Sequence, residues 1–176
     1  MEEKKLSNLG KKTHRNEHPF WLWESIMAIP QMLNACLQEQ VISQINYVAE
    51  RCSDKGINKV FLVGTGSSYF AAVAERFAFE EIAGLPTFTS VTTEFKGYTP
   101  STLDKSSAVF FHSHSGGTQG DPETVEIAKE RGAYTVGVTD LENSKLAKCV
   151  DDVIIGPGGS KIELPATRTY TTAIFR

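Results

Sequence analysis

The sequence lacks an excess of positive charge, a long apolar run and closely spaced cysteines, and each absence excludes a class of protein. A net charge of −3 creates no strong positive field, so we expect no nucleic-acid partner. No apolar run reaches the roughly 18 residues that a membrane-spanning helix needs, so we expect no membrane partner. The cysteines Cys36, Cys52 and Cys149 lack the number and spacing of a disulfide framework or a zinc site. We therefore expect reduced thiols, a cytoplasmic location, and neither a metal nor a cofactor.

The first 57 residues divide into a charged arm and a helical segment. Residues 1–17 have no apolar core, which predicts a flexible arm rather than a secretory signal. The bulky stretch "FWLWESIMAI" (20–29) is followed by Pro30, which we expect to interrupt the helix. Beyond it, apolar residues recur at every third or fourth position, as on one face of a single amphipathic helix: Leu33, Leu37, Val41, Ile45, Val48 and Cys52. Leading helices are therefore predicted over residues 18–57, with Gly56 as the C-terminal cap.

Residues 58–176 alternate between short apolar runs and helical patterns, and we treat them as one domain. The predicted strands are 59–64, 86–91, 107–113, 133–140 and 152–156. The predicted helices between them are 68–84, 122–132 and 144–150. Apolar strands that alternate with helices are typical of a parallel sheet covered on both faces. We predict an α/β fold, a three-layer sandwich whose five-stranded parallel sheet has helices on both faces.

Two loops at predicted strand-to-helix junctions are rich in glycine and hydroxyl side chains. The first runs from Gly64 to Ser68, and the second from Ser113 to Thr118. Unpaired N–H groups at a helix N-terminus attract anions, and glycine lets the backbone approach them closely. Neither loop contains Lys or Arg, so a site here acts through dipoles and hydrogen bonds. We expect five hydroxyls to converge on one phosphate: Ser67, Ser68, Ser113, Ser115 and Thr118.

Other interpretations of these loops remain open at this point. Serine and glycine are common in ordinary turns, although two such loops at similar junctions weaken that interpretation. A dinucleotide site is disfavoured because Tyr69 stands where the third glycine belongs, and no acidic residue ends the second strand near Val91. A Walker loop is excluded because the sequence contains no GK[ST] motif.

With these loops in view, the sequence resembles the SIS (sugar isomerase) domain family. The resemblance is strongest to the first SIS half of the glucosamine-6-phosphate synthase isomerase domain and to related double-SIS phosphosugar isomerases and deaminases. "TGSSYFA" (65–71) is similar to the family's "CGTSYHA", and "SHSGGT" (113–118) is similar to "SQSGET". Glu94-Phe95 matches an "EF" pair, and "PATRTYTT" (165–172) resembles "ASTKAFTT". The resemblance implies a flavodoxin-like topology.

The same resemblance implies a ligand, a phosphorylated sugar or aminosugar. Its phosphate would bind the five loop hydroxyls, and further substrate contacts would come from Gly66, His114, Gly116 and Gly117. His114 stands where the family has glutamine. The expected function is that of an N-terminal half of an aldose–ketose isomerase, deaminase or deglycase. The alternative is a regulatory module that senses a phosphosugar without turnover. Family members form dimers, and the apolar helix containing Trp21 and Trp23 also favours a homodimer or higher homo-oligomer.

Isomerisation also needs a general base, a group that opens the sugar ring and donors for a developing oxyanion. Glu94 and Glu163 are candidate bases, of which we favour Glu163 because it lies near the predicted ligand edge. Glu94 fits the start of a short helix better. His112 and His114 are candidate acids, but His112 ends a predicted buried strand and fits a hydrogen-bonded core histidine. The chain stops at Arg176 before any second SIS domain, so the resemblance places the main catalytic residues beyond it.

Overall fold

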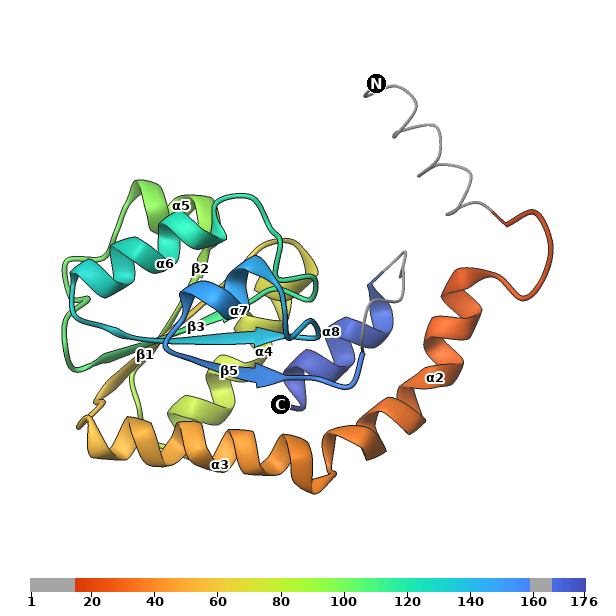
Figure 1. The fold of residues 1–176 in the computed structure, drawn as a ribbon, viewed down its shortest axis with the longest axis horizontal. Helices are drawn as coiled ribbons and strands as arrows, with labels where there is room; N and C mark the ends of the chain where they lie inside the picture. The colour runs from red at the N-terminus through yellow and green to blue at the C-terminus, as the bar shows by residue number, and fades with distance from the viewer. Residues whose placement is uncertain (1–14, 159–165) are drawn as a thin grey trace.

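The fold is built on one parallel sheet, as seen in a computed structural model that describes residues 15–158 and 166–176. Its strands are β1 (Lys59–Gly64), β2 (Thr87–Val91), β3 (Ser107–His112), β4 (Tyr134–Thr139) and β5 (Asp152–Ile155). They are all parallel and lie in the order β2-β1-β3-β4-β5 (Figure 1). This order is the flavodoxin-like arrangement of doubly wound sheets. The prediction of a five-stranded parallel sheet is confirmed.

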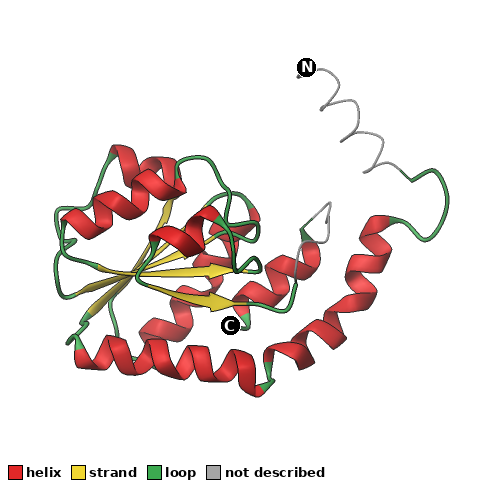
Figure 2. Cartoon of the chain, viewed as in Figure 1, coloured by secondary structure: helices red, strands yellow, loops and turns green. Residues whose placement is uncertain are grey.

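Helices cover both faces of the sheet, which confirms the three-layer prediction (Figure 2). One face carries α3 (Glu39–Asp54), α4 (Ser67–Glu81) and α8 (Thr167–Ile174). The other face carries α5 (Thr92–Gly97), α6 (Asp121–Glu130) and α7 (Lys145–Cys149). A further helix, α2 (Trp21–Cys36), packs on α8 at the side of this sandwich.

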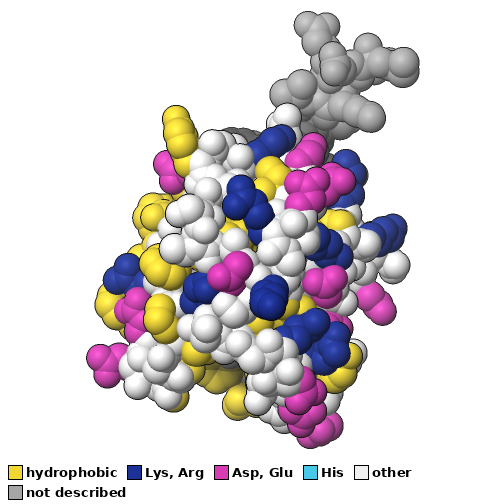
Figure 3. Space-filling model, turned by 90° about the vertical axis from the view of Figure 1, so that its left-hand side faces the viewer, with side chains coloured by type: hydrophobic (Ala, Val, Ile, Leu, Met, Phe, Trp, Pro, Cys, Tyr) yellow, Lys and Arg dark blue, Asp and Glu magenta, His cyan; other side chains and the backbone are white. Residues whose placement is uncertain are grey.

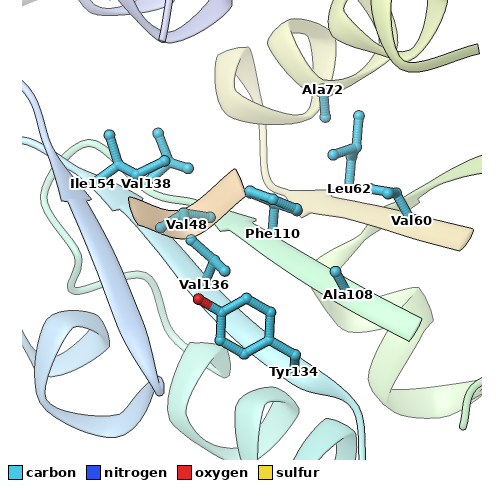
Figure 4. Close-up of a cluster of buried hydrophobic side chains, with 10 residues drawn as sticks. All are labelled: Val48, Val60, Leu62, Ala72, Ala108, Phe110, Tyr134, Val136, Val138 and Ile154. Atoms are coloured by element: carbon cyan, nitrogen blue, oxygen red, sulfur yellow. The ribbon is translucent and has the colours of Figure 1, made fainter. Parts of the chain in front are cut away.

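The apolar strands divide their side chains between two cores. In β1, Val60 and Leu62 face the α3–α4 side, whereas Phe61 and Val63 face the α5–α6 side. Figure 4 shows the first of these cores, in which Val48 of α3 and Ala72 of α4 lie among side chains from four strands. Each fully buried Val, Leu or Phe contributes about 1.5–3 kcal/mol relative to an exposed position. The uninterrupted apolar runs of the sequence are therefore what a sheet buried on both faces requires.

The helix break in the leading segment differs from the prediction. Pro30 lies inside α2, and the chain breaks instead at Leu37 and Gln38. Pro30 removes the N–H that would pair with the carbonyl of Ile26, but both residues are exposed, so water can satisfy that carbonyl. Gln38 has extended backbone and begins α3 with its carbonyl accepting from Val41 and Ile42. The expected single helix from Leu33 to Cys52 is therefore wrong.

Candidate functional site

The two hydroxyl-rich loops lie side by side at the carboxyl end of the sheet. β1 and β3 are hydrogen-bonded neighbours, with Gly64 opposite His112, so the segments that follow them leave the sheet together. The chain continues from β1 to one side of the sheet and from β3 to the other. Ligands of open α/β sheets bind at such a switch point. The topology therefore places both loops where the fold most often holds a ligand.

Glycines with positive φ shape both loops. Gly66 (φ 62°) is the N-cap of α4, and Gly116 (φ 54°) turns the loop that follows β3. A Cβ atom at Gly116 would collide with the side chain of Ser144, the N-cap of α7. The Gly116 N–H donates to the Ser113 carbonyl (2.9 Å), while the Gly116 carbonyl accepts from Leu146 (2.9 Å). This second loop (residues 113–118), the serine loop, is thus held tightly by β4 and α7.

Four of the predicted site residues line one pocket: Ser67, Ser68, Ser113 and His114. The pocket encloses about 10 Å³, enough for one group the size of a water molecule. Thr118 and Ser115 do not line it. Thr118 Oγ1 lies 2.8 Å from Ser113 Oγ, and exposed Ser115 accepts the Gly117 N–H through Oγ (3.3 Å).

Of the remaining predicted residues, three lie in the loops and two do not. Gly66, Gly116 and Gly117 form the loop backbone. Glu163, the favoured base, lies outside the described residues. Glu94 is exposed in the first turn of α5, as expected for a helix start, and does not line the pocket. The ligand-binding roles of all these residues stay predictions.

Helix α8 supplies a wall of the pocket that sequence reasoning missed. Thr169, Tyr170 and Ala173 of α8 line it, together with Arg176 just beyond the end of this helix. The signal was present, because most of this helix belongs to the "PATRTYTT" stretch that resembles the family. No carboxylate is among the described residues that line the pocket. The described lining of the pocket therefore offers no carboxylate base for proton transfer.

A buried acid and a buried imidazole lie behind the pocket. His112 Nε2 is 3.2 Å from Glu75 Oε2, and the two side chains are 3% and 11% exposed. Burial raises the pKa of Glu75 to about 8, against the opposing charge of Arg176. Burial also lowers the pKa of His112 to about 3, and Arg176 lowers it further. His112 is buried as predicted, but neither ring nitrogen makes a hydrogen bond within the described part of the chain.

These two side chains also line a neighbouring cavity of about 300 Å³ between α4, α8 and the sheet. Its other walls are largely apolar, including Phe79, Phe110 and Phe175. His112, Val138 and Arg176 line both this cavity and the smaller pocket beside the hydroxyl-rich loops, so the two spaces are neighbours.

Comparison with known proteins gives the family. Residues 55–176 match the SIS domain. The chain is 25% identical over 147 residues to a glutamine–fructose-6-phosphate aminotransferase (isomerizing) from Fusobacterium nucleatum, covering 84% of this chain and 24% of that protein. It is 32% identical over 120 residues to the human glutamine–fructose-6-phosphate aminotransferase (isomerizing) 2, covering 65% of this chain and 17% of that protein. The chain thus spans a quarter or less of these relatives.

Solved structures agree in fold. The C-terminal domain of a glucosamine-fructose-6-phosphate aminotransferase from Francisella tularensis matches with a TM-score of 0.78 and 20% identity, over 91% of this chain and 46% of that one. An Escherichia coli CFT073 protein, solved as a complex with a ligand, matches with a TM-score of 0.67 and 20% identity, over 99% of this chain and 88% of that one. Within the described residues, no helix has the length and apolar character to cross a bilayer. From the family match, the motifs and the sheet order together, this chain belongs to the SIS domain family.

Proposed function

We propose that this chain binds a phosphorylated sugar or aminosugar and forms the N-terminal half of an aldose–ketose isomerase, deaminase or deglycase. The observation that carries the proposal is the meeting of Ser67, Ser68, Ser113 and His114 in one pocket at the switch point of the sheet. The names of the curated relatives and of the Francisella tularensis structure, which refer to fructose-6-phosphate aminotransferases, support this class of ligand.

The chemistry of the pocket suits a phosphate. Hydroxyls and the N–H groups at the start of α4 donate hydrogen bonds, and the helix dipole adds partial positive charge there. The lack of a lining carboxylate among the described residues avoids repulsion. Because the pocket holds only one small group, we expect a phosphate oxygen to enter it and the sugar to lie outside, toward His114.

The alternative location for an anion is an open groove at the opposite end of the sheet, although Asp151 also lines it. Arg51, Lys55, Lys105 and Lys129 surround this groove of about 630 Å³. Figure 3 shows this end of the molecule, where Lys and Arg side chains are interspersed with Asp and Glu. Exposed cations of this kind attract anions weakly and are screened by salt. The groove also lies at the amino ends of the strands, whereas α/β sheets bind ligands at the carboxyl ends.

Three further features belong to the same proposal. We propose residues 58–176 as the SIS domain proper, with residues 18–57 as leading helices. A homodimer is proposed because α2 exposes Trp23, Ile26 and Met27, each at least 46% accessible. A cytoplasmic location is proposed from the cysteines, which form no disulfide.

The test is a binding titration of the 176-residue chain with fructose 6-phosphate, glucosamine 6-phosphate and the corresponding unphosphorylated sugars. We expect only the phosphates to bind, and we expect Ser67→Ala and Ser115→Ala each to weaken binding by roughly tenfold. Ser43→Ala, an exposed serine of α3, controls for the substitution, and Lys105→Ala probes the open groove. Loss of binding in Lys105→Ala with unchanged affinity in both loop variants would contradict the proposal.

A further inference from the structure

Asp140 connects the serine loop to α8, although nothing in the sequence marks it. It follows β4 directly, and its side chain is fully buried. One oxygen, Oδ2, lies 2.7 Å from His114 Nδ1. The other, Oδ1, accepts a hydrogen bond from Arg176 Nη1 at 2.6 Å. Each carboxylate oxygen therefore has its own partner, and the two partners line the same pocket.

The backbone that follows β5 packs closely against the side chains of Asp140 and Arg176. A Cβ atom at Gly156 would collide with Arg176 and Asp140, and one at Gly158 would collide with Asp140. Arg176 is fixed further, because Nε donates to the Thr172 carbonyl (3.1 Å) and Nη1 to the Thr139 carbonyl (3.2 Å). Asp140 consequently cannot turn away from His114 without rebuilding the loop that follows β5.

The carboxylate of Asp140 determines which ring nitrogen of His114 carries a proton. Burial acts to raise the pKa of Asp140, but the hydrogen bond from His114 and the charge of Arg176 outweigh it, so the pKa is lowered. The buried Arg176 guanidinium already neutralises this carboxylate. An ionised carboxylate only accepts hydrogen bonds, so the ring nitrogen of His114 that faces it must carry a proton. A neutral ring that donates to Asp140 must carry its proton on Nδ1, which leaves Nε2 as an acceptor.

We propose that Asp140 is a positioning residue that fixes His114 in the Nδ1–H form, so that Nε2 accepts a hydrogen bond from an O–H or N–H group of the ligand. The other polar groups of this pocket wall, Ser67, Ser68 and Ser113, are hydroxyls that can donate to a phosphate. A single fixed acceptor beside them distinguishes a sugar or aminosugar phosphate from phosphate itself. The identity of the ligand rests on the proposed function, whereas the state of the imidazole is a property of the chain alone.

The first test measures that state without ligand, by ¹⁵N NMR of the histidine rings at about pH 7, near the ordinary pKa of histidine. The His114 signals are assigned by their loss in His114→Gln. We expect a protonated Nδ1 and an unprotonated Nε2. In Asp140→Asn, Arg176 retains the amide oxygen, so the amide NH₂ faces His114 and forces the proton onto Nε2. Asp151→Asn, at the other end of the sheet, should leave the pattern unchanged. An imidazolium or an Nε2–H ring in the unsubstituted chain overturns the inference even if Asp140→Asn fails to fold.

The second test compares glucosamine 6-phosphate with inorganic phosphate as probes. We expect Asp140→Asn to weaken glucosamine 6-phosphate binding by roughly tenfold and phosphate binding by less than about twofold, because only the sugar uses the acceptor. Equal weakening of both probes overturns the positioning role. If neither probe binds the unsubstituted chain, the proposed function fails, and the NMR result still decides whether Asp140 sets the form of the ring.

Discussion

The two ends of the sheet contain similar polar residues, but burial affects the charges of these residues differently. Where the strands begin, Asp104 accepts hydrogen bonds from Ser106 and Lys59, and these lower its pKa. Asp151 lies at the same end. Partial burial acts to raise its pKa, but hydrogen bonds from Lys129 and Thr135 have the larger effect, so the pKa is lowered. These carboxylates are ionised in the folded chain and have partners that stabilise the charge.

Where the strands end, burial dominates at several groups, although not at Asp140, where burial is outweighed by His114 and Arg176 and the pKa is lowered. It raises the pKa of Glu75 to about 8 and lowers that of His112 to about 3. Burial also raises the pKa of Asp121 behind the serine loop, against hydrogen bonds from Ser113, Thr92 and Thr118. Suppressed charges of this kind reduce stability and concentrate at functional sites. The contrast agrees with the proposed binding site at the carboxyl end and with a stabilising role for the ion pairs at the amino end.

The largest difference between the ends is expected at two glycines with positive φ. An alanine in this conformation costs about 1–2 kcal/mol anywhere, and a steric clash adds about 1–3 kcal/mol. At Gly116 the new Cβ would collide with Ser144, whereas at Gly132, where the strands begin, the nearest atom is Lys105 Cβ at 3.4 Å. We expect Gly116→Ala to lower the free energy of unfolding by about 3–4 kcal/mol and Gly132→Ala by about 1 kcal/mol in urea titrations. Equal losses would show that the serine loop is not held as tightly as its hydrogen bonds indicate.

The pH dependence of stability should differ in sign between the ends. The pKa of Glu75 is raised from 4.5 to about 8 in the folded chain, so its contribution is fully present below pH 4.5 and is lost as pH rises to 8. Glu75→Gln resembles the protonated acid but does not titrate. Relative to the unsubstituted chain, this variant should gain about 4 kcal/mol between about pH 5 and about pH 9 in urea unfolding. A less stable Glu75→Gln at about pH 7 would instead indicate an ion pair with His112.

Asp151→Asn is the matched control at the other end. The pKa of Asp151 is lowered below 3.8, so the stability from its charge is present at neutral pH and is lost as pH falls through the folded value. We expect this variant to be less stable than the unsubstituted chain at about pH 7, with the difference shrinking as pH falls below about 4. A difference that grows toward acid pH would contradict the assignment.

The sequence was sufficient to predict the sheet because burial on both faces leaves a direct pattern. Runs such as "KVFLVG" and "SAVFFH" are apolar at successive positions, since neighbouring side chains enter different cores. The two hydroxyl-rich loops could be predicted as readily, because each follows a strand and precedes a helix. The prediction of a helix break at Pro30 was wrong because the energetic cost of a proline inside a helix depends on solvent exposure, which local sequence does not reveal. The carbonyl that Pro30 leaves unpaired belongs to an exposed residue and can bond to water.

The parts of the site that escaped prediction depend on contacts between distant residues. Asp140 meets His114 across 26 positions, and Arg176 meets Asp140 across 36. Aspartate, histidine and arginine form no recognisable motif at these positions. Asp140 and His114 come together only because β3 and β4 are neighbours in the sheet. The sheet order would have supplied this signal, because residues that end adjacent parallel strands share one edge. Predicting the order before assigning the site would have made Asp140 a candidate.

The smallest expected effect concerns the ion pair of Lys129 and Asp151. It tests whether solvent screens the charges at the amino end of the sheet. Lys129 Nζ lies 2.9 Å from Asp151 Oδ1, with the side chains 38% and 37% exposed. Water and salt screen such a pair, so a double-mutant cycle of Lys129→Met and Asp151→Asn should give a coupling of about 0.5 kcal/mol. The coupling should shrink further in about 1 M salt, where the Debye length is about 3 Å. A coupling above about 2 kcal/mol would mean that charges at this end are shielded from solvent as those near the pocket are, and the division of the sheet into a stabilising end and a binding end would not hold.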